Sequence, residues 1–402
     1  MSTTEEQTGV DRGGVPEYDY NEYLVEPVLS HVNKMDELRE MFPAFWNVSA
    51  PGFWVLTRMD NIREALQHPD LFSSSSVTPT EPDPPYMWIP EMVDPPEHTK
   101  WRQLLSPLFT PNAINNMEAK VRSRCIELIE PLVARGGCDF MADFAWRYPT
   151  TIFMELMGLP LEDLDQFLAW ERDILHLSAG EDPDRSKAIA AMVAVQGYFD
   201  ELIKVRRDDP HDDLLSKSIH WTFGGEPIPH EDLLSFCLLM FMAGLDTVSI
   251  QLSYSWYHLA THPEDRARVV NEPDVIPAAI EELLRFYSFV PTGRKVTRDV
   301  EFAGCPMKAD QMVHLYTPGA CRDPRAFPDA DKVIIDREVN GHIAFGAGPH
   351  RCLGSHLARR ELKVAFEEWH KRIPNYRLDP SVPVMEHGAM IGIDAISLLW
   401  DV

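Results

Sequence analysis

The stretch Phe345-Gly346-Ala347-Gly348-Pro349-His350-Arg351-Cys352-Leu353-Gly354 decides the fold of this chain of 402 residues. An amphipathic helix is predicted directly after it, from Ala358 to Trp369, because apolar residues recur there at helical spacing. Cys352 therefore stands at the start of a helix, where free backbone N–H groups and the positive end of the helix dipole favour a thiolate. Gly346, Gly348 and Gly354 let the backbone turn tightly and approach a flat group. A thiolate so placed suits an iron ligand, whereas a lone cysteine beside a glycine turn is more often structural.

The composition is that of a globular protein, with 45% hydrophobic and 25% charged residues, and it excludes a disordered or fibrous chain. The chain has no repeat and no flexible linker that would separate autonomous domains, so one large domain is expected. Lys and Arg number 37 against 63 Asp and Glu, a net charge of −26 that disfavours binding to nucleic acid or anionic lipid. The six cysteines lie far apart without a CxxC motif, which argues against a zinc site or a disulfide framework and favours reduced thiols in a cytoplasm.

Two segments bear on membrane insertion, and neither is predicted to anchor the chain. Residues 1–30 are polar and acidic, unlike a signal peptide or a membrane-anchoring segment. The uncharged run from Leu233 to Leu245 is shorter than the roughly 20 residues that span a bilayer, so we expect a helix buried on all sides. The pattern elsewhere predicts a mainly α protein with a minor antiparallel β part, its strands at Phe53–Thr57, Arg294–Phe302, Gln311–Tyr316 and Ala395–Trp400.

A proline-rich segment, Pro79 to Pro96, is predicted to form neither helix nor strand. It contains Tyr86, Met87, Trp88 and Ile89, an apolar content that is unusual for a solvated linker. It is either a binding loop or lid, or a loop that fills the core, and the segment alone favours neither.

The stretch around Cys352 resembles the haem-binding signature of cytochrome P450, Phe-x-x-Gly-x-x-x-Cys-x-Gly, at every fixed position. The resemblance extends from about Pro43 to Trp400 and is closest to soluble bacterial members of the camphor-hydroxylase kind. It implies a cytochrome P450 fold, with a catalytic domain at residues 43–402 and a partly irregular extension at 1–42. It also implies haem b between the central long helix and the ligand loop, with Cys352 binding the iron and Phe345 and Gly354 contacting the cofactor.

Three further residues match a structural element of the family. Glu282 and Arg285 form its Glu-x-x-Arg motif, and Arg337 is the arginine that joins this pair in the family. Buried charges persist only when they are fully paired, so we expect these three residues to stabilise the fold without taking part in the chemistry.

The haem propionates need cations or hydrogen-bond donors. By resemblance these are His98, Arg102, Arg294 and His350. His98 and Arg102 are one helical turn apart and can face the same side.

The predicted buried helix contains Met242-Ala243-Gly244-Leu245-Asp246-Thr247-Val248. Small residues at Ala243 and Gly244 leave room for a flat partner, and the Thr247 hydroxyl can bond to the Ala243 carbonyl and distort the helix. By resemblance, Asp246 and Thr247 are catalytic and relay protons during oxygen activation. The alternative is an Asp-Thr pair at a simple helix kink.

The resemblance implies hydroxylation of a small apolar substrate, with O2 and with electrons from a ferredoxin and its reductase. We expect a monoterpenoid or similar cyclic compound, oriented by a hydrogen bond from Tyr86, although this hydroxyl can equally face solvent or bond to backbone. Basic residues near the ligand loop predict a docking face for an acidic ferredoxin: Arg351, Arg359, Arg360, Lys363, Lys100 and Arg102. The pocket candidates are Tyr86, Trp88, Ile89, Met242, Leu245, Val248, Val290, Thr292, Met390 and Ile391.

Two other classes remain open at this point, a haem-thiolate sensor or carrier and a haem-dependent isomerase or dehydratase. The sensor has no need of Asp246 and Thr247, and an isomerase would not place oxygen from O2 in its product. We expect a cytoplasmic monomer without a nucleic-acid or membrane partner.

Overall fold

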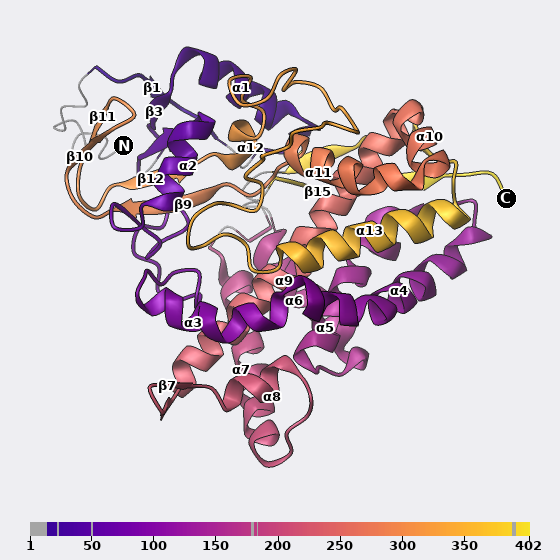
Figure 1. Ribbon diagram of the computed structural model, residues 1–402, viewed down its shortest axis with the longest axis horizontal. Helices are drawn as coiled ribbons and strands as arrows, with labels where there is room; N and C mark the ends of the chain where they lie inside the picture. Colours follow the sequence, from indigo (N-terminus) through magenta and orange to yellow (C-terminus); the bar gives the residue numbers. More distant parts are fainter. Residues whose placement is uncertain (1–13, 22–23, 50, 178–180, 183, 388–390) are drawn as a thin grey trace.

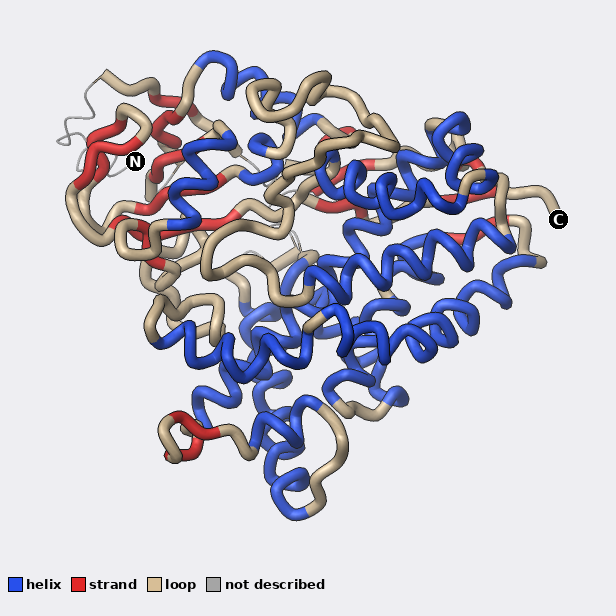
Figure 2. Tube along the Cα trace, viewed as in Figure 1, coloured by secondary structure: helices blue, strands red, loops and turns tan. Residues whose placement is uncertain are grey.

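The computed structural model describes residues 14–21, 24–49, 51–177, 181–182, 184–387 and 391–402. Helices form most of the body, and the strands β1, β3, β9, β10, β11 and β12 lie on the side where the N-terminal part of the chain lies (Figures 1 and 2). The α-helices are α1 Ser30–Met41, α2 Met59–Gln67, α3 Glu97–Leu105, α4 Pro111–Val133, α5 Arg147–Met157, α6 Leu164–Leu175, α7 Ser186–Asp208, α8 Leu214–Ile219, α9 His230–Thr261, α10 Pro263–Asn271, α11 Ile276–Phe286, α12 Thr317–Ala320 and α13 Ser355–Arg372. Shorter helical turns are η1 Ser106–Phe109, η2 Met141–Ala145, η3 Leu161–Asp163 and η4 Pro273–Val275.

The strands are short: β1 Glu17–Tyr18, β2 Glu26–Pro27, β3 Ala44–Asn47, β4 Phe53–Leu56, β5 Phe72–Ser73, β6 Gly137–Asp139, β7 Thr222–Phe223, β8 Glu226–Pro227, β9 Thr292–Val296, β10 Val300–Phe302, β11 Cys305–Met307, β12 Met312–Leu315, β13 Arg377–Leu378, β14 Met385–His387, β15 Gly392–Ile393 and β16 Ser397–Leu399. The largest sheet has the order β1-β3-β4-β12-β9-β5. Most of its pairs are antiparallel, as expected, but β12 runs parallel to β4, and β1 runs parallel to β3. Sequence patterns could not show this, because the parallel partners β4 and β12 are separated by most of the chain.

The central helix α9 organises the core and includes the predicted buried run (Figure 1). It begins after Pro229 with Glu231 and Asp232 in its first turn, where carboxylates favour a helix start, and it ends before Pro263. It is the one helix among the described residues with the length and composition to cross a membrane, yet 56% of its most apolar window is buried inside the protein. It is therefore a core helix.

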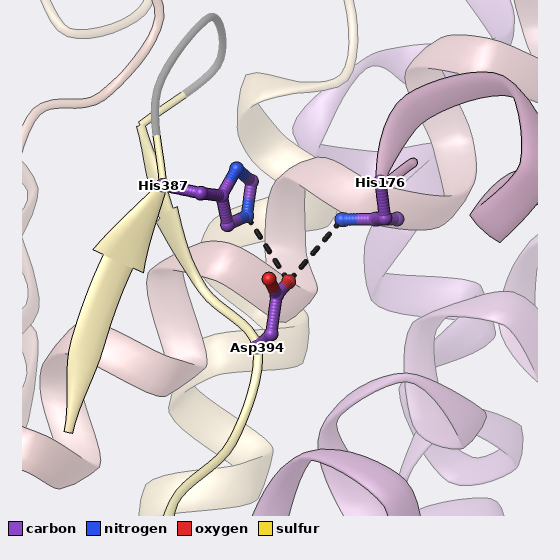
Figure 3. A group of neighbouring side chains, drawn as sticks. All are labelled: His176, His387 and Asp394. Atoms are coloured by element: carbon purple, nitrogen blue, oxygen red, sulfur yellow. Dashed lines mark ion pairs between the residues drawn. The ribbon is translucent and has the colours of Figure 1, made fainter. Parts of the chain in front are cut away.

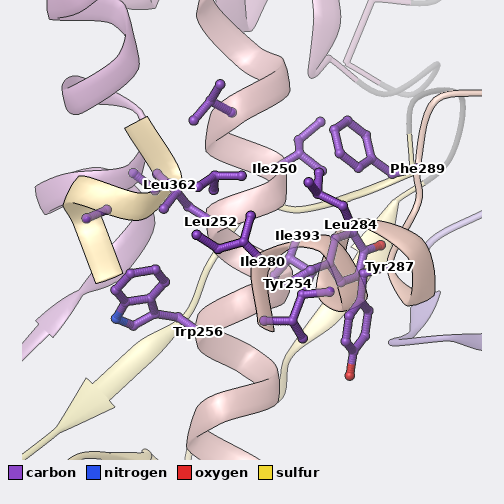
Figure 4. Packing of buried hydrophobic residues seen from close by; sticks show 14 of the residues in the cluster. Ile250, Leu252, Tyr254, Trp256, Ile280, Leu284, Tyr287, Phe289, Leu362 and Ile393 are labelled. Atoms are coloured by element: carbon purple, nitrogen blue, oxygen red, sulfur yellow. The ribbon is translucent and has the colours of Figure 1, made fainter. Parts of the chain in front are cut away.

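The C-terminal half of α9 packs between several elements (Figure 4). Its residues Ile250, Leu252 and Trp256 belong to one buried cluster with Leu284 of α11 and Leu362 of α13. These side chains are 0–4% exposed. The N-terminal half of α9 belongs to a second cluster, so the segment from Met242 to Val248 lies where the two cores meet.

The predicted N-terminal extension, residues 1–42, packs against the rest of the chain in its described part. Strand β1 joins the largest sheet through β3, and β2 pairs with β14. Helix α1 begins near Glu386, whose carboxylate accepts hydrogen bonds from the backbone N–H groups of Leu29 and His31. Short paired segments of two residues have no periodicity, which is why the sequence predicts an irregular segment here.

Candidate functional site

The loop before α13 is a compact turn that presents Cys352. The Cys352 N–H donates to the Phe345 carbonyl at 2.8 Å, and the Gly346 N–H donates to the Ile343 carbonyl at 2.8 Å. Gly348 has a positive φ, and a Cβ at this position would lie 2.1 Å from the Leu66 carbonyl oxygen. Only glycine fits there, so the signature spacing has a steric cause.

Cys352 differs from the other five cysteines because it is exposed, whereas they are buried. Its thiol is nevertheless surrounded by protein, and this burial raises the pKa of the Cys352 thiol. The Gly354 N–H and the guanidiniums of Arg102 and Arg351 lower the pKa of the thiol, in the direction predicted from the sequence, but burial is the largest effect. The prediction of a lowered pKa is therefore wrong for the thiol by itself, because the helix end was weighed without the surrounding protein.

An ion pair between α11 and α13 lies beside Phe345 of the ligand loop. Arg359 of α13 donates to Glu281 of α11 at 2.5 and 2.8 Å, and its guanidinium lies 4.5 Å from the Phe345 ring centroid. Arg359 and His342 lower the pKa of the Glu281 carboxyl to about 2, against the effect of burial. The loop is thus tied to α11 and α13 by contacts that fix the position of Phe345.

The four residues expected at the propionates gather at one place. The imidazole rings of His98 and His350 are 4.0 Å apart between centroids. Arg294 is 3% exposed, and Glu91 lies 3.9 Å from its guanidinium. Burial lowers the pKa values of His98 to about 4 and of His350 to about 3, and the nearby arginines lower them further. At neutral pH both imidazoles are uncharged hydrogen-bonding groups beside buried guanidiniums.

These features fit the haem that the resemblance implies. A buried guanidinium whose carboxylate partner is 3.9 Å away has capacity for another carboxylate, as a propionate would provide. The exposed sulfur of Cys352 is available as a ligand, and a Cβ at Gly354 would lie 4.0 Å from it. Arg102, whose pKa is lowered by burial, supplies the second cation of the group.

The α9 segment has one open side. The Thr247 hydroxyl donates to the Ala243 carbonyl at 3.0 Å, the bond that the sequence predicts, but α9 stays helical throughout. Ala243 is exposed on this side. Gly244 was expected to face the cofactor as well, but a Cβ there would lie 2.5 Å from the Phe153 ring of α5. Its small size therefore serves the contact between α5 and α9.

Asp246, next to Thr247 in α9, is in contrast fully buried. Its Oδ1 atom is 3.2 Å from Nε2 of His176, which follows α6. The carboxylate of Glu171 belongs to the same group, and burial together with Asp246 raises the pKa of Glu171 well above its usual range. Asp246 raises the pKa of His176 despite burial. Sequence reasoning missed His176 and Glu171, because nothing in α6 indicates that it packs on Asp246.

Glu282, Arg285 and Arg337 meet as the sequence predicts. Arg285 donates to both Glu282 oxygens at 2.8 and 2.7 Å, and Arg337 donates to one of them at 2.9 Å. Arg285 also donates to the carbonyls of Cys321, Ala330 and Lys332. The cluster therefore ties α11 to the segment that precedes the ligand loop.

The proline-rich segment contains neither helix nor strand in the structure, as predicted. The Tyr86 hydroxyl donates to the Glu81 carboxylate at 2.5 Å, and its ring stacks on Trp88. The Tyr86 hydroxyl has a single proton, which forms the hydrogen bond to Glu81. The expected hydrogen bond from Tyr86 to a substrate is therefore not the one that the structure contains. The Trp88 Nε1–H, in contrast, is buried and makes no hydrogen bond with the described residues.

The other pocket candidates differ in their exposure to solvent. Leu245 is fully buried, and Ile391, Ile89 and Val248 are 4–8% exposed. Leu245 belongs to the buried cluster around the N-terminal half of α9. The half-buried candidates are Trp88, Met242, Val290 and Thr292, and Met390 lies outside the described residues.

Several basic residues of the expected ferredoxin-docking face form ion pairs with acidic residues of the chain. Arg359 pairs with Glu281, Arg360 with Glu118, and Lys100 with Glu97. Lys363 lies 3.6 Å from Glu367. Arg351 is exposed and forms no ion pair within the part of the chain that the structure describes.

Comparison with known proteins extends these observations. A family model described as Cytochrome P450 matches residues 181–380. The probable cytochrome P450 127A1 of Sinorhizobium fredii is 34% identical over 352 residues, which cover 87% of this chain and 84% of the relative. The vitamin D(3) 25-hydroxylase of Pseudonocardia autotrophica is 34% identical and covers 78% of each chain. The crystal structure of CYP101J2 superimposes with a TM-score of 0.86 at 30% identity and covers 96% of this chain and 98% of that chain.

Proposed function

This chain belongs to the cytochrome P450 family and is a haem-thiolate monooxygenase, and we propose that its substrate is a small cyclic compound such as an oxygenated monoterpenoid. The observation that carries the assignment of the reaction centre is the exposed Cys352 in a loop where Gly348 is sterically required. Haem b, when bound to this sulfur, supplies the chemistry that cleaves O2 and inserts one oxygen atom into a C–H bond.

The residues of the chain would bind the cofactor, move protons and orient the substrate. Arg102 and Arg294, with His98 and His350, would bind the two carboxylates of the haem. Thr247 and Asp246 would move protons towards the open side of α9, where the Thr247 hydroxyl is already held by Ala243. Apolar side chains on the proline-rich segment and α9 would exclude water and orient the substrate.

The proposed substrate class rests on the chemistry of the proline-rich segment. Trp88 offers an indole N–H that is buried and makes no hydrogen bond with the described residues, so an acceptor oxygen on the substrate would satisfy it. The half-buried pocket candidates Met242 and Val290 are apolar and offer no cation for a fatty-acid carboxylate. A ketone, ether or alcohol on a compact hydrocarbon skeleton fits this combination.

A spectral titration tests the substrate class. Cyclic terpenoids with and without an oxygen atom, aromatics and fatty acids are added to the holoenzyme, and the shift of the haem absorption band is followed. Trp88→Phe should weaken binding of the oxygenated compounds by about 0.5–1.5 kcal/mol, the usual net contribution of one hydrogen bond. Tyr86→Phe is the matched control and should leave affinity unchanged, because its hydroxyl already binds Glu81. A shift with fatty acids and none with cyclic compounds would contradict the proposal.

We further infer that the electrons come from a ferredoxin and its reductase, and that the enzyme works in the cytoplasm as a monomer. Arg351, next to the iron ligand and exposed, supports the docking of an acidic partner at this surface. Incorporation of labelled O2 into the product distinguishes the proposed reaction from isomerisation or dehydration, which introduce no label.

A further inference from the structure

We propose that His176, His387 and Asp394 form a binding site for a divalent transition-metal ion such as Zn²⁺. The three side chains come from segments far apart in the sequence: His176 follows α6, His387 ends β14, and Asp394 follows β15. Figure 3 shows a nitrogen of each imidazole directed towards the Asp394 carboxylate. The site is separate from Cys352 and does not depend on the identity of the substrate.

The spacing of the three groups matches that of metal ligands. The Asp394 Oδ1 atom is 3.3 Å from Nδ1 of His176 and 3.1 Å from Nε2 of His387. One ligand atom of each residue lies within 4.8 Å of the other two. Two ligands held about 2.0–2.1 Å from zinc at a tetrahedral angle are themselves about 3.3 Å apart, so little movement is needed to bind an ion.

The scaffold holds His387 in place. His387 is directly opposite Gly392 in the β14–β15 pair, and a Cβ at Gly392 would lie 3.0 Å from the His387 Nε2 atom. The glycine thus lets the imidazole lie over the neighbouring strand, on the side where Asp394 follows two residues later.

A second observation, on His176, also points to a ligand. Metal-bound histidines almost always donate their other ring N–H to a carboxylate or carbonyl. The second ring nitrogen of His176, Nε2, lies 3.2 Å from Oδ1 of Asp246. Apart from this contact, both Asp246 oxygens are buried without a hydrogen-bond partner among the described residues. A metal on Nδ1 would fix the proton on Nε2 and direct it to Asp246, and the buried Glu171 carboxylate in the same group adds negative potential.

Exposure and donor chemistry decide which ion binds and where. The side chain of Asp394 is 49% exposed, which gives an ion access from solvent, whereas Glu171 and Asp246 are 0–2% exposed. A second group of possible ligands, Glu171, His176 and Asp246, lacks such access. Two imidazoles and one carboxylate suit zinc and other first-row transition ions, whereas magnesium and calcium prefer oxygen ligands throughout. Water from the exposed side would complete the coordination.

Equilibrium dialysis of the holoenzyme against Zn²⁺ tests the proposal, with zinc and haem iron counted separately by elemental analysis. The unmutated protein should bind one zinc ion per chain. His387→Ala and Asp394→Asn should each weaken binding by more than about 100-fold, because even groups behind the ligands contribute about 10–100-fold. Asp246→Asn should weaken it by about 10-fold or more. His68→Ala is the matched control, since His68 lies 3.7 Å from Asp70 in an exposed pair elsewhere and its loss should change nothing.

X-ray absorption at the zinc edge identifies the ligands. Nitrogen and oxygen neighbours at about 2.0–2.1 Å with imidazole scattering support the site, whereas sulfur at about 2.3 Å would place the ion on a cysteine and overturn the proposal. Absence of zinc binding, binding by both ligand variants as tight as that of the unmutated protein, or loss only in Glu171→Gln would also overturn it. Asp394→Asn changes a half-exposed side chain, so it keeps the test decisive if His387→Ala fails to fold.

Discussion

Replacing Glu282 with glutamine is expected to destabilise the protein by about 3–5 kcal/mol. The Glu282 side chain is 0% exposed and accepts five hydrogen bonds: two from Arg285, and one each from Arg337, the Ile334 N–H and the Asn340 amide. Glutamine keeps one oxygen acceptor but loses the charge, and its NH2 group would face a guanidinium. Arg285, which is also fully buried, would then lack its counter-ion.

The magnitude follows from two separate considerations. Removing one partner of a buried ion pair costs about 3–5 kcal/mol, because the other charge stays buried. Counting bonds leads to a similar result, since hydrogen bonds to charged groups contribute about 1.5–3 kcal/mol each and the amide loses at least two of them. Glu97→Gln is the control: Glu97 and Lys100 form an exposed pair, so this change should cost less than about 1 kcal/mol.

Guanidinium denaturation of both holoenzyme variants, followed by far-UV circular dichroism and by the haem band, measures the difference. A lower midpoint with an unchanged slope in Glu282→Gln, and little change in Glu97→Gln, is the expected result. Equal midpoints in the two variants would refute the argument that burial gives this ion pair its importance.

Three further predictions concern catalysis, electron transfer and pH. Thr247→Ala should still consume NADH but release peroxide in place of hydroxylated product, and unchanged coupling between the two would show that protons arrive by another route. The first electron transfer from the ferredoxin should slow as salt shortens the Debye length from about 30 Å to about 8 Å, and Arg351→Glu should slow it at low salt; a rate that is independent of salt would contradict docking by charge. Burial lowers the pKa of His370 to about 4, so the unfolded chain takes up a proton first as the pH falls below about 6.5. The unmutated protein should therefore lose about 2 kcal/mol more stability between pH 8 and pH 5 than His370→Gln, as measured by denaturation at the two pH values, and equal losses would show that His370 is not the group responsible.

Local sequence patterns predicted the features that depend on residues close together in the chain. Helix α13 follows from apolar spacing, α9 follows from its uncharged run, and the Thr247–Ala243 bond follows from their separation of four residues. The absence of regular structure in the proline-rich segment follows from the chemistry of proline. The parallel pairing of β4 with β12 could not be predicted, because it joins strands separated by most of the sequence.

In the site, too, contacts between residues far apart in the sequence could not be predicted. Gly244 looks like space for a cofactor in the sequence, but Phe153 of α5 occupies that direction. Tyr86 looks like a donor to the substrate, yet Glu81, five residues earlier, accepts its hydrogen bond. The group around Asp246 has no local signal at all, since α6 and the β14–β15 pair meet it only in the folded chain. Which atoms a side chain faces is decided by packing, and a motif specifies only the residue types.

The absorption spectrum of the reduced protein under carbon monoxide tests the central claim most directly. Thiolate ligation by Cys352 predicts the red-shifted Soret band that is typical of cytochrome P450, and Cys352→His should abolish this band while haem stays bound. Cys321→Ser is a control, because Cys321 is buried and the band should remain. A histidine-type band in the unmutated protein, or a red-shifted band that survives Cys352→His, would contradict the assignment of Cys352 as the iron ligand.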